Sequence, residues 1–83
     1  MFELNLTKTF ALELKKLEKT ERERIKEKLL TASINPWNYF QRLTGHDLFR
    51  IRIGKYRVIA QINSTKKKIT LLSVHRKKVY REL

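Results

Sequence analysis

The chain has 83 residues, of which 41% are hydrophobic and 10% aromatic, and this predicts one small folded domain over residues 1–83 and excludes wholesale disorder. Twenty Lys and Arg against eight Asp and Glu give a net charge of +12, and the absence of cysteine excludes disulfides and thiol chemistry. No apolar run approaches the roughly 20 residues of a membrane-spanning helix, and the first residues do not resemble a secretory signal, so we expect a cytoplasmic protein without a membrane partner.

The first part of the chain predicts a short strand followed by two helices. Apolar and polar side chains alternate from residue 2 to residue 6, as in a half-buried strand. Apolar residues then recur every three or four positions, which predicts a helix over residues 7–18. Thr20 and Glu23 match a capping box, so we expect Thr20 to be the N-cap of a second helix that ends before Pro36. The two helices would form a hairpin with one apolar face.

The rest of the chain predicts a connection and then a sheet. Three aromatic residues in the connection, Trp37, Tyr39 and Phe40, are expected to seat the helical hairpin on the sheet. From residue 49 the apolar period changes to two, which predicts strands over residues 49–53, 56–62 and 69–74. The predicted fold class is therefore α+β, with an N-terminal helical hairpin packed on a small antiparallel β-sheet and a short basic C-terminal tail.

The first two of these strands are joined by Gly54-Lys55, and a glycine followed by any residue is typical of a type II′ turn. A two-residue turn pairs Ile53 with Tyr56, and it therefore pairs Arg52 with Arg57. Opposed residues share a face of a sheet, and neighbours along one strand take opposite faces. The apolar residues of both strands are thus predicted to lie under the helices, and the arginines on the other side.

The side away from the helices would carry Arg50, Arg52 and Arg57. Like charges directly opposite each other destabilise a sheet by some tenths of a kcal/mol, so a domain that keeps Arg52 across from Arg57 is expected to use them together. Guanidinium groups suit phosphate and nucleobase contacts better than ammonium groups do. The alternative is that they are ordinary solvent-facing residues whose stems cover the sheet.

The distribution of charge favours an anionic partner. Residues 1–41 hold eight basic and six acidic side chains, a balance of +2, whereas residues 42–83 hold twelve basic and two acidic ones, a balance of +10. Such a half-domain repels itself unless an anion is nearby. Polyphosphate or an acidic protein is the natural candidate.

The end of the last strand adds three candidate residues. If this strand runs beside the hairpin, its end places Arg76 near the arginines. Tyr80 could stack on a base or supply a proton, although a tyrosine in a tail also suits packing. An imidazole can act as an acid or a base near neutral pH, but regular alternation predicts that His75 faces away from Arg76.

Two segments resemble motifs of the RelE/ParE toxin superfamily. Residues 48–59, LFRIRIGKYRVI, resemble its "LyRIRvGdYRvif" stretch, and residues 75–80, HRKKVY, resemble its closing "HRxxVY" motif. The helical segment ending at Asn35-Pro36, and then Leu43 and Gly45, also follow the order of that family. The resemblance covers nearly the whole chain, and the two motifs together are specific.

The resemblance implies a toxin of a type II toxin–antitoxin pair, neutralised by an acidic, largely helical antitoxin. In the RelE branch the toxin enters the ribosomal A site and cuts mRNA, so the ribosome and mRNA would be further partners. Carried over to matching positions, the catalytic residues would be Arg57, Arg76 and Tyr80. The set assigned to RNA or phosphate binding is Arg50, Arg52, Lys55, Lys77 and Lys78, and His75 is a further candidate acid or base.

Arg50 and Arg52 depart from the bacterial RelE pattern, which has lysines at these positions. Because arginine stays protonated at ordinary pH, neither residue can readily act as a general base. They would instead orient the scissile phosphate and stabilise charge on its oxygens. The proton acceptor for attack by the ribose 2′-oxygen would be Tyr80, His75 or a ribosomal RNA group, and the sequence leaves these three open.

Two other functions fit the same sequence. A ParE-like toxin would poison DNA gyrase without cutting RNA, and a shared fold does not exclude this. An inactive relative would only bind RNA or its antitoxin. The chain has no Gly-rich phosphate loop and no acidic metal cluster, so any chemistry is expected to need neither a metal nor another cofactor.

Overall fold

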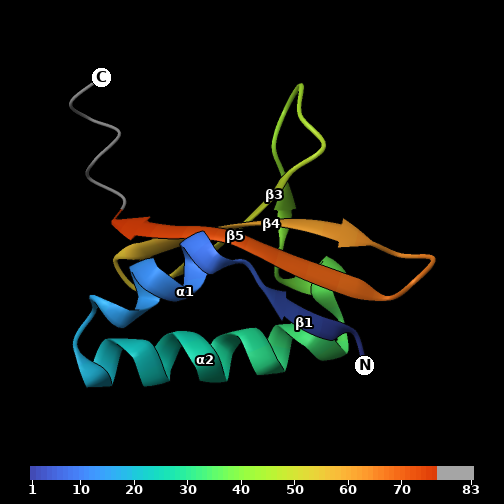
Figure 1. Ribbon diagram of the computed structural model, residues 1–83. Helices are drawn as coiled ribbons and strands as arrows, with labels where there is room; N and C mark the ends of the chain where they lie inside the picture. Colours follow the sequence, from blue (N-terminus) through green and yellow to red (C-terminus); the bar gives the residue numbers. More distant parts are fainter. Residues whose placement is uncertain (77–83) are drawn as a thin grey trace.

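Two layers make up the structure, a computed structural model that describes residues 1–76 (Figure 1). The helical layer contains α1 (Lys8–Lys15) and α2 (Lys19–Ile34), followed by the short 3-10 helix η1 (Pro36–Asn38). The other layer is a sheet made of β1 (Glu3–Leu6), β2 (Gln41–Arg42), β3 (Phe49–Ile53), β4 (Tyr56–Asn63) and β5 (Lys68–Arg76). Both α1 and α2 lie on one side of the sheet (Figure 1), and we call the opposite side the outer face.

The strands follow the order β1-β5-β4-β3-β2, and every neighbouring pair except β1–β5 is antiparallel. The predicted α+β fold class is therefore confirmed. Sequence alternation did not identify β2, because two residues are too few to reveal a period. It also did not indicate that β1 would run parallel to β5 at the edge of the sheet, because that pairing joins distant parts of the chain.

The helical hairpin is present, but its second helix begins earlier than predicted. Thr20 lies inside α2, and Glu18 occupies the N-cap position without a side-chain hydrogen bond, so the predicted capping box is wrong. The turn between the helices is short, and in it the Arg22 guanidinium donates a hydrogen bond of 2.6 Å to the Leu17 carbonyl. This contact satisfies a carbonyl just after α1 from the first turn of α2. As predicted, α2 ends before Pro36.

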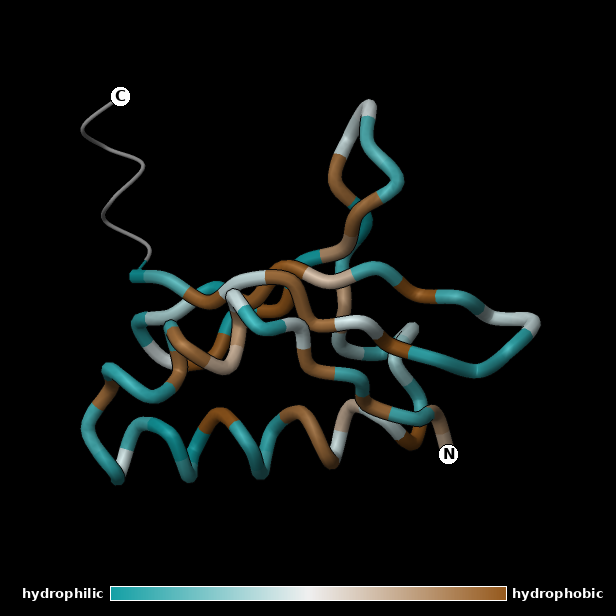
Figure 2. The backbone as a smooth tube through the Cα atoms, in the orientation of Figure 1, coloured by the Kyte–Doolittle hydropathy of each residue, from teal (hydrophilic) through white to brown (hydrophobic). Residues whose placement is uncertain are grey.

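The core lies between the two layers. In Figure 2 the hydrophobic segments of the helices face the sheet, and the hydrophilic segments of α2 face outward. The buried residues from the helices are Phe10, Leu14, Ile25, Leu29 and Ala32. Those from the sheet are Phe49, Ile51, Ile53, Tyr56, Val58, Ala60, Ile69, Leu71 and Val74. Burial of this apolar surface is the main favourable contribution to folding.

Aromatic residues attach the end of the helical layer to the sheet. The Trp37 ring packs edge-on against Phe2 and Phe49, with centroid distances of 6.2 and 5.8 Å. Phe40 is buried, and the Tyr39 ring lies 5.1 Å from the Lys28 ammonium nitrogen. The predicted packing role is confirmed for Phe40, which is buried, and for Trp37, which contacts the sheet through Phe49 although half of it is exposed. Tyr39 is exposed, and its ring contacts α2 through Lys28.

Thr7 connects α1 to β5 and also caps α1. Its Oγ1 accepts a hydrogen bond of 3.1 Å from the Phe10 N–H and donates one of 2.8 Å to the Leu71 carbonyl. The Thr7 N–H donates to the same carbonyl at 3.1 Å. One hydroxyl therefore orders the helix start and the contact between the two layers.

Replacing Thr7→Ala removes the cap and the side-chain bond to β5, so we expect the free energy of unfolding to fall by about 1–2 kcal/mol. Thr7→Ser keeps the hydroxyl and should lose less than half as much. Urea unfolding followed by circular dichroism compares the two variants with the parent. Equal losses would show that the methyl group, and not the hydroxyl, is responsible.

Candidate nucleic-acid interface

The turn between β3 and β4 has the geometry that the sequence predicts. Gly54 has a φ of 60°, and within residues 1–76 Lys67 is the only non-glycine residue with positive φ. Lys55 therefore has the negative φ that a type II′ turn requires at its second position. A Cβ at position 54 would also lie 3.0 Å from Nη1 of Arg24 on α2, so the turn packs closely beneath that helix.

The register of the hairpin is also confirmed. Arg52 pairs with Arg57, and Arg50 pairs with Ile59. Ile51 and Ile53 on the same strand are only 2% and 4% exposed, because they face the helices. By register the three arginines therefore occupy outer-face positions, as the pairing argument predicts. Arg50 and Arg52 also line hollows at the edge of the sheet that they share with Lys28 of α2.

The three arginines differ in how they are held. The Arg50 Nη2 donates a hydrogen bond of 2.6 Å to Oε1 of Gln41, its partner residue on β2. Arg57 is partly buried between β3 and β5. Arg52 is exposed and borders a hollow of about 390 Å³ beside α2. The α2 residues that line this hollow are Arg24, Glu27, Lys28 and Thr31.

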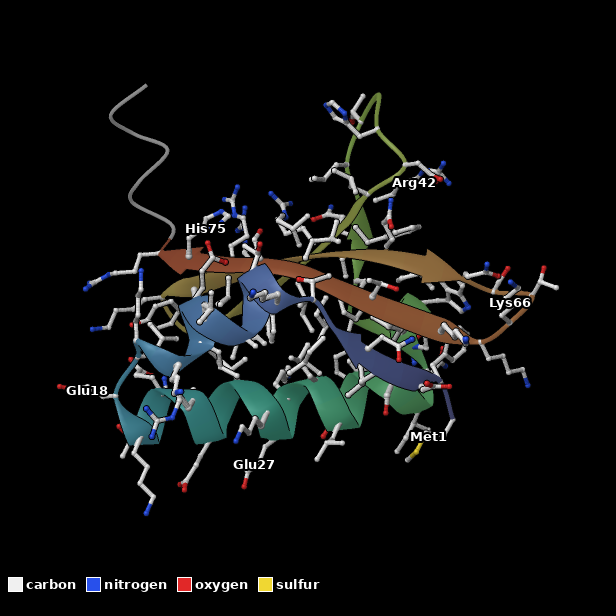
Figure 3. The ribbon with its side chains drawn as sticks, viewed as in Figure 1. Met1, Glu18, Glu27, Arg42, Lys66 and His75 are labelled. Atoms are coloured by element: carbon white, nitrogen blue, oxygen red, sulfur yellow. The ribbon has the colours of Figure 1, made fainter. Side chains whose placement is uncertain are left out.

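A β-bulge in β5 determines which residue near the end of that strand lies on the same face as Arg57. Ala60 pairs with Leu71 and Ile59 pairs with Ser73, so Leu72 is an extra residue without a partner on β4. After Leu72, each residue of β5 therefore faces the side of the sheet opposite to the one that regular alternation predicts. As a result His75 lies opposite Arg57. Figure 3 shows His75 on the side of the sheet away from the helices.

The register therefore corrects the expected position of Arg76. Arg76 pairs with Tyr56, whose side chain is buried on the helical side, so it occupies a position on the opposite face from Arg57. The physical cause is the bulge at Leu72, which regular alternation does not include. Of the other candidates, Lys55 is exposed in the β3–β4 turn. Lys77, Lys78 and Tyr80 lie outside the described residues.

Helix α1 holds the bulge in place from the helical side. The Glu13 carboxylate accepts a hydrogen bond of 2.9 Å from the Val74 N–H, two residues after Leu72. Thr7 Oγ1 contacts the Leu72 carbonyl at 3.3 Å in addition to its bond with Leu71. The pairing of β1 with β5 ends at Leu71, and Thr7 and Glu13 supply hydrogen-bond partners to the β5 backbone at and beyond that point.

Carboxylates are concentrated in the helical layer. Five of the acidic residues among residues 1–76 belong to α1, α2 or the turn between them, namely Glu13, Glu18, Glu21, Glu23 and Glu27. The two others are Glu3, opposite Lys68 at the edge of the sheet, and Asp47, which forms a 3.3 Å ion pair with Arg42. The end of the outer face that carries Arg57 and His75 is therefore a positively charged surface.

Within residues 1–76 no group of three or more His, Cys, Asp or Glu side chains is placed to hold a metal ion. In the same part of the chain, no helix has the length and apolar character needed to cross a membrane.

A family model of the ParE toxin of the type II toxin–antitoxin system parDE matches residues 4–80. The chain belongs to the ParE toxin family. It is thus a toxin of a type II toxin–antitoxin system within the RelE/ParE superfamily, as the two sequence motifs indicated. No curated protein sequence matches it significantly.

Solved structures of RelE toxins have the same fold. The RelBE2 toxin–antitoxin complex from Mycobacterium tuberculosis is 22% identical, covers 92% of this chain and 98% of its own, and has a TM-score of 0.83. The intact E. coli RelBE complex is 26% identical, with coverage of 92% and 96% and a TM-score of 0.78. The isolated E. coli RelE toxin is 27% identical, with coverage of 99% and 94% and a TM-score of 0.74.

Sequence reasoning missed two supporting residues and one shift of register. Gln41 contacts Arg50 through the pairing of the two-residue strand β2, and Glu13 contacts Val74, which is 61 residues away, and no local pattern marks either contact. The bulge does leave a signal, because apolar residues move from odd positions, Ile69 and Leu71, to even positions, Leu72 and Val74. Adjacent leucines within an alternating strand could have indicated it.

Replacing Glu13→Ala leaves the Val74 N–H without its acceptor, so we expect a loss of about 1–3 kcal/mol in the free energy of unfolding. It should also shift the backbone NMR resonances of residues 72–75. Glu13→Gln retains an acceptor oxygen and should preserve those resonances. Unchanged resonances in Glu13→Ala would mean that the bulge is held by β4 and Thr7 alone.

Proposed function

We propose that this toxin is an mRNA endoribonuclease that acts in the ribosomal A site. The observation that carries the proposal is the outer face, where Arg57 and Arg52 lie across from each other and His75 follows Arg57 on the next strand. These groups supply phosphate binding and proton transfer side by side on a rigid sheet. The RelE structures at 26% and 27% identity support the same assignment over nearly the whole chain.

The proposed chemistry is transfer of the phosphodiester to the neighbouring ribose oxygen. The 2′-hydroxyl attacks phosphorus and gives up its proton to a base, the bond from phosphorus to the 5′-oxygen breaks, and the leaving oxygen takes a proton from an acid. The products are a 2′,3′-cyclic phosphate and a 5′-hydroxyl end. Arg52 and Arg57 would bind the non-bridging oxygens, on which charge increases.

The proton-transfer residues of this proposal come from the end of the chain. His75 is the described residue of that type beside Arg57, and its imidazole can give or take a proton. Tyr80 remains a candidate donor on the strength of the HRKKVY motif. Arg76 would contribute to RNA binding from the strand end, where it is exposed.

The proposed partner for neutralisation is an acidic antitoxin, as in the RelB–RelE complexes. On the helical side an apolar groove of about 230 Å³ runs between edge strand β1 and α2. Its lining residues are Leu4, Leu6, Phe10, Leu14, Lys26, Leu29, Leu30 and Leu71. Leu6 and Leu30 are 54% and 57% exposed, so an amphipathic antitoxin segment would bury them while pairing with the edge of β1.

A second candidate function is inhibition of DNA gyrase. The observation in its favour is that the matching family model is the one for ParE toxins. In the first function the outer face contacts RNA, and in the second the toxin contacts gyrase. The same substitutions on the outer face therefore have different expected effects.

Purified toxin added to programmed ribosomes should cut a defined mRNA at A-site codons, with and without EDTA, as mapped by primer extension. Arg57→Ala should slow cleavage about 100-fold or more, because a donor to the developing charge is lost. His75→Ala should slow cleavage while leaving binding to ribosomes unchanged. Lys16→Ala, an equal change of charge at the exposed C-cap residue of α1, is the control and should cleave normally.

Uncut mRNA, together with inhibition of supercoiling by purified gyrase, would replace the nuclease with the ParE-like function. Uncut mRNA, active gyrase and a chain that still binds RNA would identify an inactive relative.

Substitution of Leu30→Gln in the apolar groove should weaken binding of the cognate antitoxin by about tenfold, because burial of one leucine contributes roughly 1.5–3 kcal/mol. Toxicity in the absence of the antitoxin should be unchanged. The matched control is Leu12→Gln on α1, which is 53% exposed and lies outside the groove. Isothermal titration calorimetry gives both affinities, and equal affinities would place the antitoxin elsewhere.

A further inference from the structure

We propose that the lysine turn, which comprises Lys66 and Lys67 between β4 and β5 and Lys68 at the start of β5, is a second RNA phosphate-binding site on the same outer face. This inference rests on the proposed function, since it assigns the turn to the RNA that the arginines bind. It adds a site that neither sequence motif includes. The chemistry that the site recognises is the phosphodiester backbone, without selection of bases.

The lysine turn and the arginines are joined by one continuous face. Gln61 pairs with Thr70 and Asn63 pairs with Lys68. On β4 these residues alternate with the buried Ala60 and half-buried Ile62, so they lie on the same side as Arg57. The outer face thus runs along β4 and β5 from His75 at one end to the lysine turn at the other, and Figure 3 shows His75 and Lys66 at these opposite ends.

The separation of the two ends suits a strand of RNA. Asn63 is six positions after Arg57 on β4, which corresponds to about 20 Å of extended β-strand. At about 3.4 Å per nucleotide in a stacked strand, this is roughly six nucleotides. An RNA held at the arginines would need to extend by about that length before its backbone reached Lys68.

A polar hollow lies at the lysine end of the face. Its volume is about 530 Å³, and the residues that line it are Asp47, Gln61, Ile62, Asn63, Ser64, Lys66, Lys68 and Thr70. Amide and hydroxyl groups of this kind donate hydrogen bonds to phosphate oxygens, and the lysines add charge. Side chains from β4, β5 and the turn therefore offer both kinds of phosphate contact.

The turn holds its lysines in a defined conformation that has an energetic cost. Asn63 Oδ1 accepts a hydrogen bond of 3.0 Å from the Lys66 N–H. Lys67 has a φ of 54°, in the left-handed region where glycine or asparagine is preferred. The Lys67 carbonyl accepts a hydrogen bond of 2.8 Å from the Glu3 N–H, which fixes the turn to β1. A lysine kept at a position that favours glycine is consistent with a use for its charge.

The lysines of the turn are not neutralised within the described residues. The ion pairs Arg24–Glu21 and Arg42–Asp47 of the described residues include none of the three lysines. Asp47 borders the hollow and Glu3 lies opposite Lys68, so two carboxylates reduce the local positive charge without removing it. Asp47 would repel a bound phosphate, and its loss should strengthen RNA binding.

The test measures binding and not cleavage, so it can fail independently of the proposed nuclease. Single-stranded 2′-O-methyl RNA, which lacks the attacking hydroxyl, is titrated with the toxin over a range of salt concentrations and followed by fluorescence anisotropy. The variant combines Lys66→Ala, Lys67→Gly and Lys68→Ala. The matched control, with the same change of charge in the helical layer, combines Lys15→Ala, Lys16→Ala and Lys19→Ala, all exposed residues.

For a 12-nucleotide RNA, the lysine-turn variant should lower the slope of log K against log salt by about 2, since each phosphate contact to a single strand contributes about 0.7. The control variant should keep the slope of the parent. For a 4-nucleotide RNA, which is too short to span both ends, the two variants should bind alike. Asp47→Asn should raise the affinity for the 12-nucleotide RNA about two- to threefold. Lys67→Gly alone should raise the melting temperature, which separates loss of binding from loss of folding.

The same titration with a 12-base-pair RNA duplex identifies the source of the phosphates. A lower slope of log K against log salt for the lysine-turn variant, with either the single strand or the duplex, supports the site. The RNA that shows the larger decrease indicates whether the lysine turn contacts a single strand or a folded RNA. Equal slopes for the lysine-turn variant and the control would overturn the proposal. So would an equal loss of affinity for polyglutamate, because the turn would then bind acidic polypeptide as readily as RNA.

Discussion

The pairing of β4 with β5, interrupted at Leu72, is the feature on which the arrangement of the outer face depends. Before the interruption, Ile69 and Leu71 fill the core, and after it Val74 does so. The extra residue lets the strand keep its apolar side chains inside although their spacing changes from two to three. The same change places His75 beside Arg57. Packing in the core and the composition of the candidate site are therefore consequences of one local irregularity.

The two sides of the sheet differ in polarity and charge. The helices cover one side, and an apolar groove beside β1 remains open there. The other side carries the arginines, His75 and the lysine turn. An apolar groove favours a protein segment that loses water on binding, whereas a basic polar face favours a polyanion. Because the two surfaces are separate, an antitoxin on the groove would need to extend around an edge of the sheet to cover the arginines directly.

The comparisons describe a fold that is shared more widely than any one activity. The matching family model is that of ParE toxins, whereas the structures with 26% and 27% identity are RelE toxins. A common backbone leaves activity to the side chains on the outer face. Among those side chains, Arg50 and Arg52 stand where the bacterial RelE pattern has lysines, and arginine does not readily act as a general base. The proposed nuclease would therefore use His75, Tyr80 or a ribosomal RNA group for proton transfer.

The sequence by itself determined the features that arise from neighbouring residues. A two-residue turn set the pairing of Arg52 with Arg57, alternation separated the arginines from the core, and apolar spacing located the helices. Tertiary structure alone decided the parallel pairing of β1 with β5 and the bond from Glu13 to Val74, which spans 61 residues. It also decided the face that His75 occupies. A local pattern records the period of a strand, but pairings and hydrogen bonds between distant segments depend on how the two layers pack, which no local pattern contains.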